Sequence, residues 1–277
     1  MLERFTYTNN FNETLEFGKD SLFVNENDLR DFAWDITSKN DKISGFKKGI
    51  VSKTIPIILK CYSETEGVQL RNRLFEVFEK DVLAKKHGRL QIGDYYLRCY
   101  ITGSKKTQYL VDKGYMLVSA TVQTDYPNWV KEVTSMFNTE GGDSQGDGEF
   151  LDFPYDFSHD FKSSLVKSEI NNTNFVNSDF IMTIFGYAQI PTIYVGGHRY
   201  AVNVVVDDDE YLTIDSVNKT IVLTKANGEQ VNCFNDRNKD SYIFEKIPVG
   251  ISTVIALNQR IKFNITLLEE RSEPKWI

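Results

Sequence analysis

The chain has 277 residues, of which 41% are hydrophobic, 26% charged and 13% aromatic, and its formal net charge is −7. This length and composition suit two globular domains, and no run approaches the roughly 18 apolar residues of a membrane-spanning helix. The acidic balance argues against a duplex-binding surface, which needs clustered cations. No leader with a cleavage site opens the sequence, so we expect folding in the cytoplasm.

The first elements predicted are an extended hairpin or exposed loop and a strand. Glycines flank a basic pair in Ile43–Ile50 (ISGFKKGI), which predicts the hairpin. Thr54–Tyr62 (TIPIILKCY) predicts a strand that leads directly into a helix.

One helix stands out, over residues 64–86. Ser63 and Glu66 match a capping box, in which Ser63 is the N-cap and Glu66 returns to the N–H of Ser63. Apolar residues then recur at spacings of three and four: Leu70, Leu74, Val77, Phe78 and Val82. Basic residues follow, and Gly88 suits the position just after the helix.

Strands follow the helix. Residues 89–92 precede a turn at Gly93-Asp94, and apolar and polar residues alternate from Tyr95 to Ile101, as in a half-buried strand. We expect a loop at Gly103–Gln108 and a second strand around Val118–Val122. A sheet of this kind has free edges, which ring oligomers can join between subunits.

A polar break then divides the chain. Residues 139–148 (TEGGDSQGDG) hold no apolar side chain, so they cannot bury enough surface to offset the entropy of ordering them. We therefore place one domain at 1–138, a linker at 139–149 and a second domain at 150–277. The segment after the break, residues 150–157 (FLDFPYDF), is too apolar for a linker.

The second half shows repeated short strands. Gly196-Gly197 and Asn227-Gly228 predict tight hairpin turns. Strands are expected at 211–216, 220–224, 230–234, 253–257 and 261–267. The whole chain is thus predicted to be mainly β, with two antiparallel β-sandwich domains, the first of which carries one long helix.

The sequence indicates no catalytic, cofactor or metal site, and we expect no enzyme. Ser158-His159-Asp160 is contiguous, whereas a catalytic triad assembles from separated positions. Asp152, Asp156 and Asp160 lack the spacing of a calcium loop. The cysteines Cys61, Cys99 and Cys233 lie far apart in apolar surroundings, as buried reduced thiols do.

An alternative function rests on the tyrosines. A carbohydrate-binding module would recognise host cell-wall polymers through the C-terminal sandwich, at about 150–277, by stacking sugars on aromatic rings. Seven tyrosines of the chain are candidates for a sugar-binding face: Tyr95, Tyr96, Tyr100, Tyr187, Tyr194, Tyr200 and Tyr211. Ordinary cross-strand packing is the simpler explanation.

Several motifs together resemble the distal tail (Dit) proteins of long-tailed phages or prophages. LDFPYDF at 151–157 is similar to the signature that opens the C-terminal half of that family. Further matches are GRLQI at 88–92, GDYY at 93–96, DYPNW at 125–129, TIDS at 213–216 and IPVG at 247–250.

The resemblance implies a structural virion component of the tail tip, assembled in the bacterial cytoplasm. In that family the N-terminal domain forms a hexameric ring that joins the tail tube protein to the tip or baseplate proteins. DNA passes through the ring without specific binding, and no membrane is involved. The second domain is galectin-like and lies outside the ring. A hairpin, placed by resemblance at about residues 38–53, laps onto the neighbouring subunit, so its residues are the expected oligomer interface: Ile43, Gly45, Phe46, Lys47, Lys48 and Ile50.

Overall fold

The computed structural model describes residues 4–19, 21–24, 26–110, 114–138, 169–257 and 261–276. The chain forms two compact units. The N-terminal unit comprises Met1–Lys131 and Glu270–Ile277, and the C-terminal unit comprises Glu132–Glu269. The sequence prediction differs in two ways: it ended the first domain at residue 138, and it assigned residues 270–277 to the second domain. The expected linker 139–149 and the motif at 151–157 lie outside the described residues.

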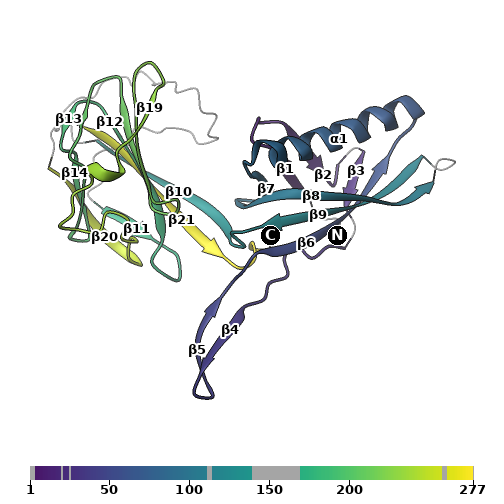
Figure 1. The fold of residues 1–277 in the computed structure, drawn as a ribbon, viewed down its shortest axis with the longest axis horizontal. Helices are drawn as coiled ribbons and strands as arrows, with labels where there is room; N and C mark the ends of the chain where they lie inside the picture. Colours follow the sequence, from purple (N-terminus) through teal and green to yellow (C-terminus); the bar gives the residue numbers. More distant parts are fainter. Residues whose placement is uncertain are drawn as a thin grey trace. The chain divides into compact units, whose positions relative to one another are not determined.

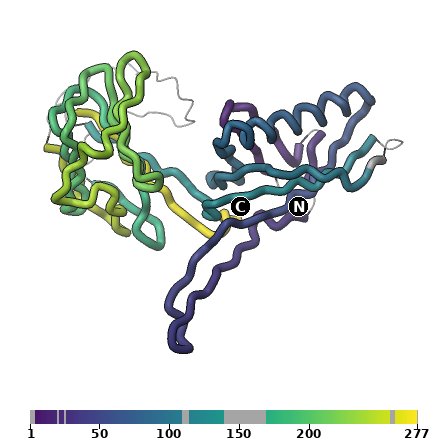
Figure 2. The backbone as a smooth tube through the Cα atoms, viewed as in Figure 1, coloured from purple at the N-terminus to yellow at the C-terminus, as the bar shows by residue number. Residues whose placement is uncertain are grey.

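The chain crosses between the units twice, within strands β10 (Trp129–Asn138) and β21 (Lys262–Arg271). Both ends of the chain therefore belong to the N-terminal unit (Figure 2). Sequence patterns missed this return because it needs only eight residues at the end of an ordinary strand.

The N-terminal unit is an antiparallel sheet with one helix on it (Figure 1). The strand order is β2-β1-β7-β8-β9-β6-β3. Its strands are β1 (Phe5–Thr8), β2 (Thr14–Phe17), β3 (Leu22–Val24), β6 (Val51–Lys60), β7 (Gly88–Ile92), β8 (Tyr95–Leu110) and β9 (Tyr115–Thr124). Two more strands, β4 (Asp35–Lys39) and β5 (Lys42–Lys47), form a separate pair.

Two strand predictions in this unit need correction. The loop expected at Gly103–Gln108 is part of β8, which pairs with β9 along its whole second half and absorbs two register shifts as bulges. The strand expected at 54–62 runs from Val51 to Lys60. Pairing with β9 determines the extent of both β6 and β8, and the local sequence of each strand does not reveal that pairing.

Helix α1 (Glu64–Ala84) begins as predicted. The Ser63 hydroxyl accepts the N–H of Glu66 at 3.2 Å, but the Glu66 carboxylate accepts the N–H of Tyr62 and not that of Ser63. The helix ends at Lys85, which takes the left-handed conformation (φ 54°), so Gly88 lies in β7 instead. Leu74, Val77 and Phe78 are buried as expected, but Val82, predicted on the buried face, is 40% exposed.

The C-terminal unit contains one sheet of order β19-β18-β17-β12-β21 and a second of order β11-β20-β14-β15. Its other strands are β11 (Glu169–Asn172), β12 (Asp179–Phe185), β13 (Ala188–Gln189), β14 (Thr192–Val195), β15 (His198–Ala201), β16 (Val205–Val206), β17 (Tyr211–Asp215), β18 (Thr220–Thr224), β19 (Gln230–Asn232) and β20 (Gly250–Ala256). The short 3-10 helix η2 (Phe234–Asp236) follows β19. The Gly-Gly and Asn-Gly hairpins are confirmed by the β14–β15 and β18–β19 pairings.

Each unit has its own apolar core. The N-terminal core holds Trp129, Tyr7 and Leu29, and the C-terminal core holds Phe180, Tyr200 and Phe263. The mainly β class with antiparallel sheets and one long helix is therefore confirmed. No helix in the described part of the chain has both the length and the hydropathy needed to cross a bilayer.

Candidate assembly interface

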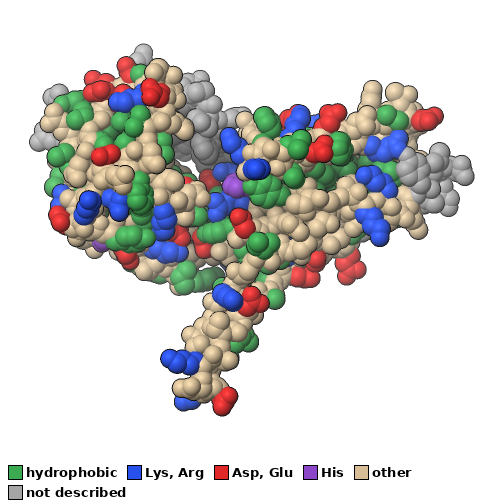
Figure 3. Space-filling view, viewed as in Figure 1, with side chains coloured by type: hydrophobic (Ala, Val, Ile, Leu, Met, Phe, Trp, Pro, Cys, Tyr) green, Lys and Arg blue, Asp and Glu red, His purple; other side chains and the backbone are tan. Residues whose placement is uncertain are grey.

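A two-stranded arm projects from the N-terminal unit (Figures 1 and 3). We define the arm as β4, β5 and the turn between them. Asn40 and Asp41 both have positive φ (51° and 59°), as a tight two-residue hairpin turn requires. Among the described residues β4 and β5 pair only with each other, and every arm residue except the half-buried Gly45 is exposed. Isolated two-stranded hairpins are marginal in water, so a partner that covered such an arm would stabilise it.

One face of the arm is apolar. Ile36 lies opposite Phe46 in the register, and Trp34 shares the face of Ile36 because it precedes it by two residues. A register shift after Thr37 places Ile43 opposite Ser38, which also belongs to this face. The arm's apolar face thus comprises Trp34, Ile36, Ile43 and Phe46, which are 47%, 60%, 61% and 62% exposed.

The other face of the arm is polar. It carries Asp35, opposite Lys47, and the basic pair Lys39 and Lys42 beside the turn. The arm is therefore an amphipathic ribbon with two unpaired edges, which is the form of surface that another chain can cover.

Lys48 holds the base of the arm in place. Its ammonium donates to the carbonyl of Pro127 at 3.2 Å, to Oδ1 of Asn128 at 2.8 Å and to the hydroxyl of Ser272 at 3.0 Å. The same nitrogen lies 4.4 Å from the centre of the Trp34 ring. Partial burial lowers the pKa of Lys48, opposed by the nearby charge of Glu270. The returning C-terminal residues therefore help to fix the direction in which the arm leaves the unit.

A second contact joins the C-terminal residues to the segment before the arm. The Arg30 guanidinium lies 3.9 Å from the Trp276 ring centre and donates to the carbonyl of Pro274 at 2.8 Å. Lys53, at the start of β6, donates to the carbonyls of Asp28 and Asp31 at 2.8 and 2.5 Å. Side-chain contacts therefore hold the chain both before β4, at residues 28–31, and after β5, at Lys53.

The six predicted interface residues fall in different places. Ile43 and Phe46 lie on the arm's apolar face, Lys47 lies on the polar face, and Ile50 is 78% exposed beyond β5. Gly45 lies opposite Thr37. A Cβ atom at position 45 would lie 2.9 Å from the Thr37 hydroxyl, which is closer than an ordinary contact, so a larger residue there would require a shift. Lys48 belongs to the base and is not free. The arm is Asp35–Lys47, not 38–53, so the predicted range left out Ile36, and Trp34 directly precedes the arm. The Asn-Asp pair between two alternating segments was the signal that would have found them.

Other candidates from the sequence form no site in the described residues. Ser158, His159 and the aspartates at 152, 156 and 160 lie outside them. Within the described ranges no group of three His, Cys, Asp or Glu side chains could hold a metal ion. The seven tyrosines do not form one face, since they are divided between the two units and both Tyr95 and Tyr200 are buried.

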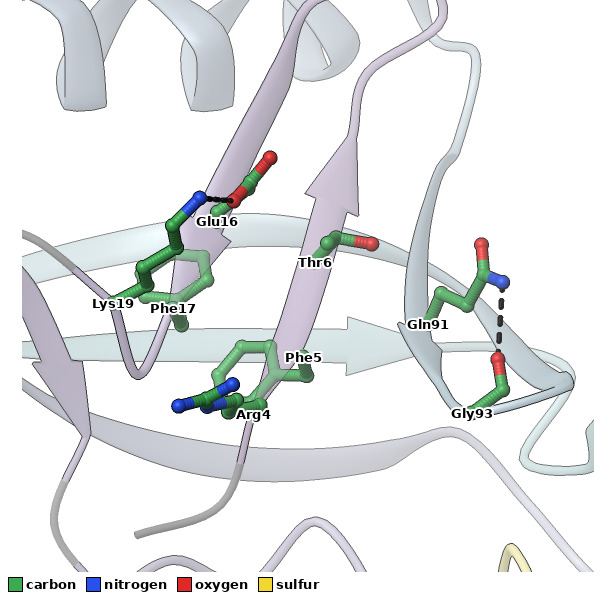
Figure 4. A pocket seen from close by; sticks show the side chains of 8 residues that line it. All are labelled: Arg4, Phe5, Thr6, Glu16, Phe17, Lys19, Gln91 and Gly93. Atoms are coloured by element: carbon green, nitrogen blue, oxygen red, sulfur yellow. Dashed lines mark hydrogen bonds and ion pairs between the residues drawn. The ribbon is translucent and has the colours of Figure 1, made fainter.

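A hollow of about 410 Å³ lies at one end of β1 and β2 in the N-terminal unit (Figure 4). Phe5 and Phe17 stack at 4.7 Å beneath it and are buried. Lys19 pairs with Glu16 at 3.6 Å, and the Gln91 amide donates to the carbonyl of Gly93 at 3.0 Å, so these three side chains of the lining already have partners. Arg4 and Thr6 complete the polar part of the lining.

Solved structures of phage proteins have a similar fold. The Dit (gp 19.1) protein of phage SPP1, presented as a paradigm of hub adsorption apparatus in phages that infect Gram-positive bacteria, matches with a TM-score of 0.57 and 13% identity. That match covers 96% of this chain and 99% of the SPP1 protein. A chain of the phage P2 baseplate in its activated conformation with Ca matches with a TM-score of 0.56 and 14% identity, covering 96% and 98% of the two chains. The structure of the same baseplate with Sr matches with a TM-score of 0.57 and 15% identity, and the match covers 95% of this chain and 97% of the baseplate chain.

No protein-family model matches the sequence, and no curated protein matches it. The likeness therefore concerns the fold, and it extends over both units. The chain therefore shares its fold with the SPP1 Dit protein and with chains of the phage P2 baseplate.

Proposed function

We propose that this protein is a structural hub of a phage tail, a distal tail protein of the virion. Copies of the N-terminal unit would close into a six-membered ring that joins the tail tube protein to the tip or baseplate proteins, and DNA would pass through without specific binding. The C-terminal unit, galectin-like by the same resemblance, would face outward and brace adsorption proteins. The protein would assemble in the bacterial cytoplasm and carry out no bond chemistry.

The observation that carries this proposal is the likeness of the fold to the SPP1 Dit protein, which covers 96% of the chain. The arm, which its own unit leaves uncovered, gives it further support. If the arm of one subunit binds a different surface of the next, the contact is heterologous, and such a contact closes a ring when the rotation between subunits allows it.

Native mass spectrometry and negative-stain microscopy of the purified protein test the proposal. We expect assemblies of six copies that appear as rings. The double variant Ile36→Glu with Phe46→Glu should remain monomeric, because it buries charge at the centre of the contact. Ile255→Glu, at a residue 53% exposed in the C-terminal unit, is the matched control and should still assemble. A wild-type protein that stays monomeric at the highest attainable concentration would contradict the proposal.

A further inference from the structure

The outer side of β20, in the C-terminal unit, departs from the pattern of an exposed strand. Side chains along β20 alternate between buried and exposed positions, as in a strand at the surface of a sandwich. Exposed positions of such strands usually carry polar side chains, but two of those in β20 are Ile251 and Ile255, which are 69% and 53% exposed. Leu257 continues the alternation and is 62% exposed. A strand that is apolar on both sides is typical of one that is covered on both sides.

Neighbouring strands extend this surface. The register places Ile255 of β20 opposite Tyr194 of β14, and Tyr194 opposite Arg199 of β15. The next pair in the register, Ile193 and Tyr200, is buried in the core. Because side chains alternate along each strand, the first three residues lie on the opposite side of the sheet from the core. We define the β20 face as Tyr194, Arg199, Ile251, Ile255 and Leu257.

Arg199 brings an unsatisfied cation to the β20 face. Its Nε atom is buried, yet it has no hydrogen-bond partner in the part of the chain that the structure describes. A buried N–H without an acceptor is rare in folded proteins, because it loses its hydrogen bond to water and gains none. A carboxylate on the segment that covers this face would supply a strong acceptor.

The chain that precedes β11 enters the unit beside the β20 face. β11 begins at Glu169, which lies opposite Thr253, and the pairing is antiparallel, so the chain enters β11 from the end at which Ile255 lies. Eleven residues, 158–168, separate β11 from the aromatic segment 150–157. Eleven residues span at most about 40 Å, so the tether allows segment 150–157 to reach the β20 face at a high effective concentration.

The composition of segment 150–157 (FLDFPYDF) matches the β20 face. The segment holds five large aromatic or aliphatic side chains, which suit the three aliphatic side chains of the face. It also holds Asp152 and Asp156, and the stretch from Glu140 to Asp160 contains no lysine or arginine. Its charge is therefore complementary to that of Arg199.

We propose that segment 150–157 packs on the β20 face of its own chain, where the carboxylate of Asp152 or Asp156 accepts a hydrogen bond from Arg199. The segment then completes the C-terminal unit by covering the apolar side of β20. This inference does not depend on the proposed function, because it concerns contacts within one unit of one chain.

Hydrogen exchange of the full-length protein, measured by mass spectrometry, tests the inference. In wild type, the amides of segment 150–157 should exchange at least about tenfold more slowly than those of a free peptide of the same sequence. Ile251→Asp with Ile255→Asp should bring them to the rate of the peptide, because the apolar contact is lost. Val205→Asp, at a residue 47% exposed on β16, is the matched control and should leave the exchange unchanged.

Exchange within β12 shows whether each variant is folded. If the double change unfolds the unit, the single change Ile255→Ser replaces it and should accelerate exchange of segment 150–157 in the same direction. Exchange of the segment at the peptide rate in wild type would overturn the inference. Slow exchange that persists when β20 is changed would also overturn it, because the segment would then pack elsewhere.

A double-mutant cycle tests the contact with Arg199 separately. Asp152→Asn with Asp156→Asn should accelerate exchange of segment 150–157, and the same changes should have no further effect in an Arg199→Met background. Additive effects would overturn the contact with Arg199, whereas the packing on the isoleucines would stand.

Discussion

Replacing Gly88 with alanine should destabilise the N-terminal unit through a steric conflict with α1. A Cβ at Gly88 would lie 2.4 Å from Oδ2 of Asp81, 2.5 Å from the Tyr7 hydroxyl and 2.7 Å from Cζ of Tyr7. Tyr7 lies on β1 and Asp81 on α1, and the two side chains form a buried hydrogen bond between the strand and the helix. The Tyr7 hydroxyl donates to Asp81 at 2.5 Å, and the main-chain N–H of Asn10 donates to the same carboxyl at 2.8 Å.

The expected loss of stability follows from three contributions. The Asp81 carboxyl must retreat by about 1 Å to restore ordinary contact, which breaks a buried hydrogen bond to an acidic side chain at a cost of about 1.5–3 kcal/mol. Overpacking adds about 1–3 kcal/mol. The lower entropy of the unfolded alanine chain offsets about 0.4–1 kcal/mol. The free energy of unfolding should therefore fall by about 2–5 kcal/mol.

Tryptophan fluorescence during urea unfolding measures this loss in one unit. All three tryptophans, Trp34, Trp129 and Trp276, belong to the N-terminal unit, so their signal does not report the other. With a slope of about 2 kcal/mol per M, the midpoint should fall by about 1–2.5 M. Gly103→Ala is the control, since its Cβ would meet only the Thr121 side chain at 3.1 Å, and it should cost under about 1 kcal/mol. A midpoint for Gly88→Ala within 0.2 M of wild type, on the order of the measurement error, would refute the reasoning.

Three further predictions concern the base of the arm and the thiols. Lys48→Met removes three hydrogen bonds and the cation beside the Trp34 ring, so it should destabilise the unit by about 1.5–3 kcal/mol and hasten proteolysis at the arm; unchanged cleavage would contradict this. Burial raises the pKa of Glu270 above its usual 4.5, so its ionisation opposes folding, and stability falls as pH rises through that raised pKa. Glu270→Gln removes this ionisation and also changes the hydrogen bonds that the carboxyl accepts from Tyr126 and Asn128, so the stability of the variant relative to wild type should rise as pH increases through the raised pKa; a relative stability that rises on acidification would contradict this. Burial raises the pKa of all three thiols, and only Cys61 is not fully buried, so a thiol reagent should modify one cysteine slowly in the native protein and three in denaturant.

Much of the secondary structure followed from local patterns. The Ser63 cap, the apolar spacing from Leu74 to Phe78 and the Gly196-Gly197 turn each depend on residues a few positions apart, and the structure confirms them. The predictions failed where distant segments decide the outcome. Strand β8 continues through Gly103–Gln108 because β9 pairs with it, and Val82 is exposed because the N-terminal unit buries a narrower face of α1 than the spacing predicts.

The arm shows the same division. The glycines and lysines of residues 43–50 predicted a hairpin, but its centre at Asn40-Asp41 and its apolar face depend on the pairing of Ile36 with Phe46 across the turn. The role of Lys48 depends on Ser272, which is 224 residues away in sequence.

The sequence by itself determined that the chain is mainly β, that one capped helix interrupts the strands of its first half, and that short hairpins fill the second. These features arise from hydrophobic period, caps and turns, which act within a few residues. Only the tertiary structure decided that the last residues return to the N-terminal unit and that the arm and several apolar side chains of α1 are left uncovered. Burial is a property of the assembled fold, and no local pattern records which apolar side chains the rest of the chain will reach.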